Sequence, residues 1–80
     1  MYLVYAIRSE KDGRIYVGMC AKFETRLKEH NAGKTKSTKG YRPWKLIYLE
    51  EAADRNEARK RGKYLKSGAG EEFLKSIKVP

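Results

Sequence analysis

The sequence is poor in cysteine and has no long apolar run. Cys20, its single cysteine, can form neither an internal disulfide nor a multi-cysteine zinc site. No apolar stretch approaches the roughly 20 residues that a membrane-spanning helix needs. The N-terminal MYLVYAIRSE lacks a basic lead and carries Arg8 within its apolar run, which argues against a signal peptide. We therefore expect one cytoplasmic domain over residues 1–80, with Cys20 as a small buried hydrophobe.

Acidic residues are also scarce in comparison with basic ones. Nineteen Lys and Arg residues stand against ten Asp and Glu, which gives a net charge of +9. Such an excess is typical of nucleic-acid-binding proteins, because neutralising phosphates releases their condensed counterions. A solvated basic surface that only confers solubility is the alternative. The charge alone favours a nucleic acid as the partner.

Three short segments have the composition of β-strands. Residues 2–7, YLVYAI, and residues 44–50, WKLIYLE, are rich in aromatic and β-branched side chains. The pair Asp12-Gly13 is a turn signal, and a second strand, RIYVG at residues 14–18, follows it. The first two strands should therefore form a hairpin with a loop of about six residues.

Two helices are indicated by their boundaries as well as by their spacing. The first starts at Lys22 and ends at Gly33, a residue type suited to the position after a helix C-terminus. Asp54, with Glu57 three residues later, predicts a cap that opens a second helix over residues 55–67.

A third, shorter helix is expected at the C-terminal end. Gly68 and Gly70 should break the chain before it, so we place it over residues 71–77. The order is then β-β-α-loop-β-α-α. It predicts an α+β fold, a small three-stranded antiparallel sheet flanked by helices.

Four side chains indicate a phosphodiester site. Tyr5 and Tyr16 lie on the first two strands, Arg26 follows Tyr16 by ten residues, and His30 is four residues further on the same helical face. A phenolate or imidazole can take a proton from an attacking water, and a guanidinium can hold phosphate oxygens and their growing charge. The plain alternatives are core-filling strand tyrosines, a solvated arginine, and a surface or capping histidine.

The loop GKTKSTKGYRPWK, with room for one helical turn, is a candidate surface for tracking phosphates. Tyr41 and Trp44 can stack on exposed bases or anchor the loop, and we expect Trp44 in the core. The loop contains no acid, and its cations are Lys34, Lys36, Lys39, Arg42 and Lys45. The second helix carries six more cations, spread too widely for all to face one ligand, and we assign Lys63 to the nucleic acid.

The pattern resembles the GIY-YIG endonuclease superfamily over about residues 2–77. The segments TKSTKGYRPWKLIY and KYLKSGAGEEFLK are similar to its small bacterial members, which share a domain with an excision-repair endonuclease subunit. The motifs that carry the resemblance are Leu3-Val4-Tyr5, Tyr16-Val17-Gly18 and Arg26-Leu27-x-x-His30-Asn31. Leu3-Val4 in place of Gly-Ile leaves the tyrosine unchanged, and it is the tyrosine that acts.

The resemblance implies a hydrolase that cuts phosphodiester bonds in DNA with Mg²⁺ or Mn²⁺. Branched or damaged DNA is the expected substrate and DNA repair the setting. No small-molecule cofactor is implied, and whether a protein partner supplies specificity is left open. Tyr5 or Tyr16 is implied as the general base or the group that orients the water. Arg26 is implied to stabilise the transition state and His30 to assist proton transfer. Gly18 is implied to let the backbone pack closely.

Gly62, on the expected inner face of the second helix, departs from the family pattern. Family members usually carry a glutamate there, which the resemblance implies is the sole protein ligand of the metal, so no metal ligand is assigned. Three readings remain open: natural loss that leaves a nucleic-acid-binding module, an engineered replacement, or another carboxylate. Glu57 lies about 140° around the helix and points elsewhere. Glu50 and Glu51, at the end of the third strand, are the candidates for replacement.

Overall fold

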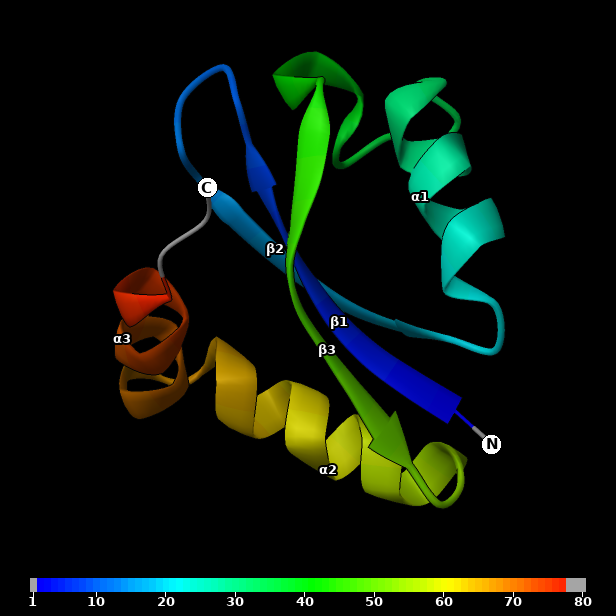
Figure 1. The fold of residues 1–80 in the computed structure, drawn as a ribbon, viewed down its shortest axis with the longest axis vertical. Helices are drawn as coiled ribbons and strands as arrows, with labels where there is room; N and C mark the ends of the chain where they lie inside the picture. The colour runs from blue at the N-terminus through cyan, green and yellow to red at the C-terminus, as the bar shows by residue number, and fades with distance from the viewer. Residues whose placement is uncertain (1, 78–80) are drawn as a thin grey trace.

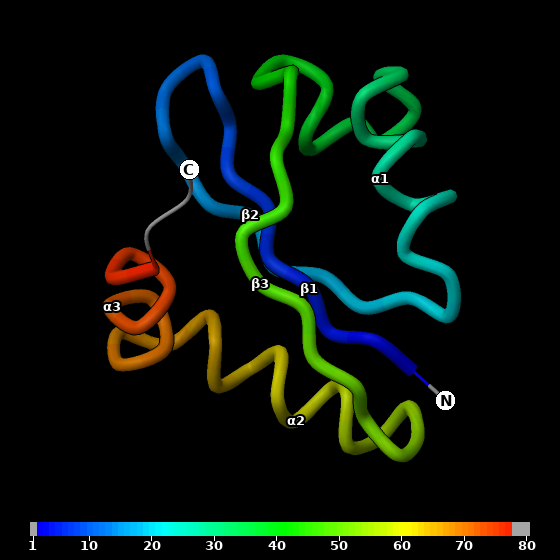
Figure 2. The backbone as a smooth tube through the Cα atoms, viewed as in Figure 1, coloured from blue at the N-terminus to red at the C-terminus, as the bar shows by residue number. Residues whose placement is uncertain are grey.

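An antiparallel sheet of three strands organises the chain, in the order β2 (Ile15–Cys20), β1 (Tyr2–Ser9) and β3 (Trp44–Ala52). In the computed structural model, which describes residues 2–77, α1 lies on one side of the sheet and α2 and α3 on the other (Figures 1 and 2). The elements are β1 Tyr2–Ser9, β2 Ile15–Cys20, α1 Phe23–Asn31, the 3₁₀ turn Lys39–Tyr41, β3 Trp44–Ala52, α2 Arg55–Lys66 and α3 Gly68–Ser76. This arrangement confirms the predicted fold class.

The alternation of side chains along β1 divides the core into two layers. Val4 and Ala6 face α2 and α3, where they pack with Val17, Ala58, Leu65 and Leu74. Tyr5 and Ile7 face α1 and pack with Cys20 and Trp44. Cys20 and Trp44 are each 4 % exposed, so both were correctly assigned to the interior.

The start of α2 follows the predicted cap. The Asp54 carboxylate accepts a hydrogen bond from the backbone N–H of Glu57 at 2.9 Å, which satisfies one of the free donors of the first turn. The predicted start of α3 was wrong, because α3 begins at Gly68 instead of residue 71. Ser67 Oγ accepts from the backbone N–H of Gly70, and the glycine lets α3 pack directly on the backbone of Tyr64 and Leu65. Gly70 therefore does not break the chain before α3. It lies within α3 and allows this helix to pack closely on the end of α2.

No helix within residues 2–77 is long and apolar enough to cross a membrane.

Candidate nucleic-acid site

The structure brings the two tyrosines and the histidine together under α1. The Tyr5 hydroxyl lies 2.8 Å from His30 Nε2, and the Tyr16 ring meets the His30 ring edge-on with centroids 5.2 Å apart. The Tyr5 and Tyr16 centroids are 6.5 Å apart. Arg26, one turn before His30 on α1, has a half-exposed side chain, and its charge acts on both Tyr5 and His30. Tyr5, Tyr16 and His30 thus form one cluster, and Arg26 is one helical turn away from it on α1.

A chain of hydrogen bonds defines the protonation of His30. Thr38 Oγ1 donates to the carbonyl of Thr35 at 3.3 Å, so it accepts from His30 Nδ1–H at 2.8 Å. The unprotonated Nε2 then accepts from the Tyr5 hydroxyl. Tyr5, His30 and Thr38 are at most 2 % exposed, and we refer to them as the buried triad.

The electrostatics of the buried triad keep it neutral. Burial, followed by the Arg26 charge, lowers the pKa of His30 below its ordinary 6.5. Burial, followed by Tyr16, raises the pKa of the Tyr5 hydroxyl far above its ordinary value. The Tyr5 hydroxyl therefore stays protonated and donates a hydrogen bond to His30. A protonated hydroxyl of this kind is a poor general base.

Gly18 is required by the position of Tyr5. It lies opposite Tyr5 in the β1–β2 register, and a Cβ on residue 18 would be 2.5 Å from the Tyr5 hydroxyl oxygen. A larger residue would displace the phenol from His30. The space that Gly18 leaves is thus filled by the side chain of Tyr5.

Tyr16 differs from Tyr5 in its surroundings. It lies on β2, an edge strand of the sheet, and is only half-buried. It borders a cleft of about 390 Å³ between β2 and α2, which we call the edge cleft. The lining residues are Tyr16, Val17, Gly18, Met19, Ala58, Arg59, Gly62, Lys63 and Lys66. Of the two tyrosines, Tyr16 is the one that borders this cleft.

Gly62 lies on the side of α2 that faces β2, where it lines the edge cleft together with Ala58. Ala58 and Leu65 are buried, but Gly62 is half-exposed, and no atom lies within 4 Å of the position that its Cβ would occupy. A side chain at residue 62 would project into free space beside Tyr16 and Gly18.

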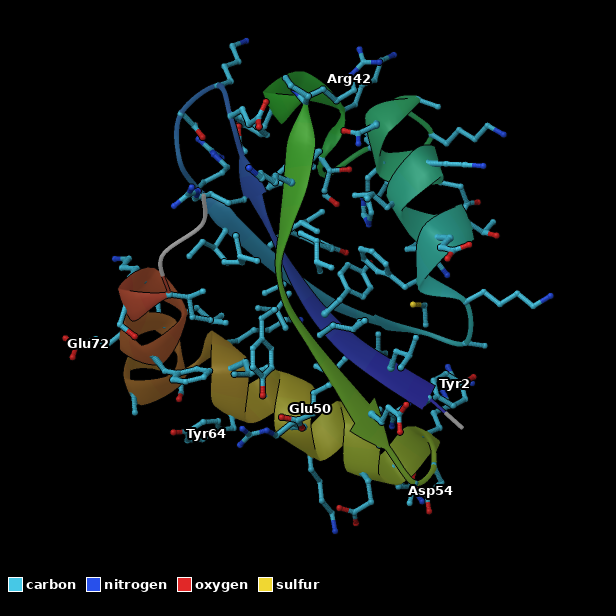
Figure 3. All side chains as sticks on the ribbon, in the orientation of Figure 1. Tyr2, Arg42, Glu50, Asp54, Tyr64 and Glu72 are labelled. Carbon is cyan, nitrogen blue, oxygen red and sulfur yellow. The ribbon has the colours of Figure 1, made fainter. Side chains whose placement is uncertain are left out.

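The edge cleft does not fit a divalent metal ion, because its lining includes no carboxylate. Glu50 is on β3 at the far side of β1, where it accepts from Arg61 Nε at 2.9 and 2.8 Å and from the Tyr48 hydroxyl (Figure 3). Glu51 is exposed opposite Leu3. The described residues contain no group of three or more His, Cys, Asp or Glu side chains that could hold a metal. The structure thus gives no support to replacement by Glu50 or Glu51.

A second hollow adjoins the edge cleft and shares Tyr16, Val17 and Lys66 with it. It includes two carboxylates, but each is already paired with a cation. Asp12 lies 2.7 Å from Arg14 Nε, and Glu71 lies 3.0 Å from Lys75 Nζ.

The loop cations lie away from α2. Figure 3 shows Arg42 at the opposite end of the molecule from Asp54 at the start of α2. Lys34, Lys36, Lys39 and Arg42 are exposed, and Lys45 is half-buried. The Tyr41 ring is covered by the Arg14 guanidinium, 3.5 Å from its centroid. The loop cations and the cations of α2 therefore form two separate basic regions.

Sequence reasoning did not find Thr38, which fixes the orientation of His30. It lies eight residues from His30, and its backbone carbonyl also accepts from Trp44 Nε1 at 2.9 Å. Only the folded loop brings these groups together, and no motif signals them.

The chain is similar to a protein-family model, to sequences of other proteins and to a solved structure. Residues 1–72 match the model of the GIY-YIG catalytic domain. A UPF0213 protein of Staphylococcus haemolyticus is 36 % identical over 77 residues, which cover 95 % of this chain and 93 % of that protein. The solution structure of a UPF0213 protein from Bacillus halodurans has a TM-score of 0.56 and 30 % identity, and covers 95 % of this chain and 84 % of its own. The human structure-specific endonuclease subunit SLX1 is 33 % identical over 53 residues, 61 % of this chain and 19 % of that protein.

Proposed function

The chain belongs to the GIY-YIG family of catalytic domains, and from that premise we propose that it binds DNA at the edge cleft. It keeps the side chains that would hold a phosphodiester but lacks the carboxylate that would hold a metal. The observation that carries this proposal is the pairing of the Tyr5, Tyr16 and His30 cluster, with Arg26 one helical turn away, and a carboxylate-free cleft. We propose accordingly that hydrolysis is absent or strongly reduced.

The geometry supports different roles for the four residues. Arg26, with its half-exposed guanidinium, would donate to the non-bridging phosphate oxygens. Tyr16, at the cleft, would contact the phosphate or a water beside it. Tyr5 and His30, buried and bonded to each other, would position these groups. The cations of the loop would contact phosphates further along the strand.

A second candidate is a working endonuclease that uses Mg²⁺ or Mn²⁺. The family's description as a catalytic domain favours it, and so does the similarity to a structure-specific endonuclease subunit, which suggests branched DNA as the substrate. This candidate requires a metal held without residue 62.

Cleavage assays separate the two candidates. Supercoiled and branched DNA would be incubated with Mg²⁺ or Mn²⁺ and with the parent protein, Gly62→Glu, or Arg26→Ala. We expect no cutting by the parent, but cutting by Gly62→Glu that disappears when Arg26→Ala is added. Cutting by the parent that Arg26→Ala abolishes would instead establish the working endonuclease.

Binding is the second test. Fluorescence anisotropy with labelled branched and duplex DNA should show an affinity that falls steeply with salt. Absence of binding at low ionic strength would refute the proposed function, whatever the cleavage assays show.

A further inference from the structure

The six cations of α2 differ in their ion pairs and in whether they line the edge cleft. Arg61 is neutralised by Glu50 at 2.8 Å, and Lys60 is paired with Glu57 at 3.5 Å. Arg55 is the first residue of α2 and does not line the edge cleft. The other three do line it and have no ion pair within the described part of the chain; these cleft cations are Arg59, Lys63 and Lys66.

The cleft cations are spaced so that they repel one another. Arg59 and Lys63 are four residues apart and Lys66 is three further on, so all three follow one stripe of the helix. Like charges at this spacing destabilise a helix. An anion seated among them would remove that repulsion.

Gly62 lies between these cations and leaves the space open. No atom lies within 4 Å of the position of its missing Cβ, and the residues opposite are Tyr16 to Met19 on β2. The cleft therefore combines three cations, no carboxylate and free room at residue 62.

We propose that the cleft cations bind a backbone phosphate of DNA directly, with no divalent ion between protein and phosphate. Ammonium and guanidinium groups supply the positive charge at a site where the residues do not fit a metal. DNA binding at the edge cleft is then independent of Mg²⁺. This inference rests on the proposed function and specifies how the DNA is held.

The experiment is fluorescence anisotropy with a labelled branched DNA, in EDTA and in Mg²⁺ at matched ionic strength. The test variants are Lys63→Gln and Lys66→Gln. The matched control is Lys60→Gln, which removes the same charge from the same helix but from a residue outside the cleft that is paired with Glu57. All three lysines are exposed, so the fold should be unaffected, and circular dichroism checks this.

We expect Mg²⁺ not to strengthen binding by the parent protein. Lys63→Gln and Lys66→Gln should each weaken binding severalfold and reduce the slope of log K against log salt by about 0.9 for each lost phosphate contact. Lys60→Gln should change affinity less than twofold. Gly62→Glu should weaken binding in EDTA, because it puts a negative charge among the cleft cations.

The outcomes that overturn the inference differ from those that overturn the proposed function. If the parent protein does not bind DNA, both fail. If it binds, but Lys63→Gln and Lys66→Gln lose no more affinity than Lys60→Gln, only the assignment of the cleft fails. If Mg²⁺ strengthens binding by the parent at matched ionic strength, direct contact between the cations and the phosphate is refuted. Unchanged affinity of Gly62→Glu in EDTA would place the phosphate elsewhere.

Discussion

The buried triad and the edge cleft differ in how they are tied to the rest of the protein. In the triad, His30 is hydrogen-bonded to Tyr5 on one side and to Thr38 on the other. Gly18 makes room for the Tyr5 side chain. At the cleft, Gly62 has empty space in place of a side chain, and three cations have no ion-pair partner among the described residues.

This difference separates stability from chemistry. A change in the triad leaves a buried polar group unsatisfied and so destabilises the fold, whether or not the protein is an enzyme. A change at residue 62 has no such consequence for folding. The roles of Tyr5, Gly18 and His30 in stability are therefore difficult to separate from a role in catalysis, whereas residue 62 can be changed without disturbing the fold.

The largest effect should come from Gly18→Ala. The added Cβ would lie 2.5 Å from the Tyr5 hydroxyl and 2.6 Å from its Cζ, so the phenol must move away from His30. Overpacking of this kind typically lowers the free energy of unfolding by 1–3 kcal/mol, and we expect a loss of about 3 kcal/mol in urea denaturation. A loss below about 0.5 kcal/mol would mean that Tyr5 can move freely, and the contrast between triad and cleft would fail.

Thr38→Val should have a somewhat smaller effect. It keeps the shape of the side chain but leaves His30 Nδ1–H buried without its acceptor. An unsatisfied buried donor costs about 1–3 kcal/mol, so we expect a loss of about 2 kcal/mol in the free energy of unfolding. The control is Thr38→Ser, which retains the hydroxyl. If valine and serine destabilise the protein equally, the hydroxyl does not hold His30.

The pH dependence of stability tests the same triad. The lowered pKa of His30 means that the unfolded chain takes up a proton first as the pH falls below 6.5. Stability should therefore fall with decreasing pH below 6.5, by at most about 1.4 kcal/mol per pH unit, until His30 in the folded protein is also protonated. Unfolding curves between pH 7.5 and 5, about the usual range of histidine titration, should be steeper for the parent than for His30→Gln. Equal pH slopes would show that His30 titrates as freely in the folded protein as in the unfolded chain.

The fold was predictable from sequence because its signals are local. Alternating aromatic and β-branched residues marked the strands, and Asp54 with Glu57 marked the start of α2. The start of α3 was not predictable, because Gly70 fits against the backbone of Tyr64, a contact that exists only between folded helices.

The candidate site was predictable only in its motif residues. The spacing of Tyr5, Tyr16 and His30 anticipated their cluster, but Thr38 joins it through a loop contact without a sequence signal. Helical periodicity grouped Gly62 with Ala58 and Leu65, but it could not show that residue 62 opens into a cleft at the edge of β2. Which cations of α2 are paired could not be predicted either, because the partner of Arg61 is Glu50 on β3.

The smallest effect, and the only stabilising one, should come from Gly62→Ala. Glycine in a helix interior is about 0.8–1.0 kcal/mol less favourable than alanine, and the new methyl group would meet no atom within 4 Å. We expect the free energy of unfolding to rise by about 1 kcal/mol, which corresponds to a Tm about 4–8 °C higher for a domain of this size. Alanine offers no ligand and no charge, so DNA binding in EDTA should be unchanged.

Gly70→Ala is the matched control, because its methyl group would collide with the backbone of Leu65 and destabilise the protein. A loss of stability on Gly62→Ala would mean that the fold requires glycine at residue 62, and the separation of stability from chemistry at this cleft would no longer hold.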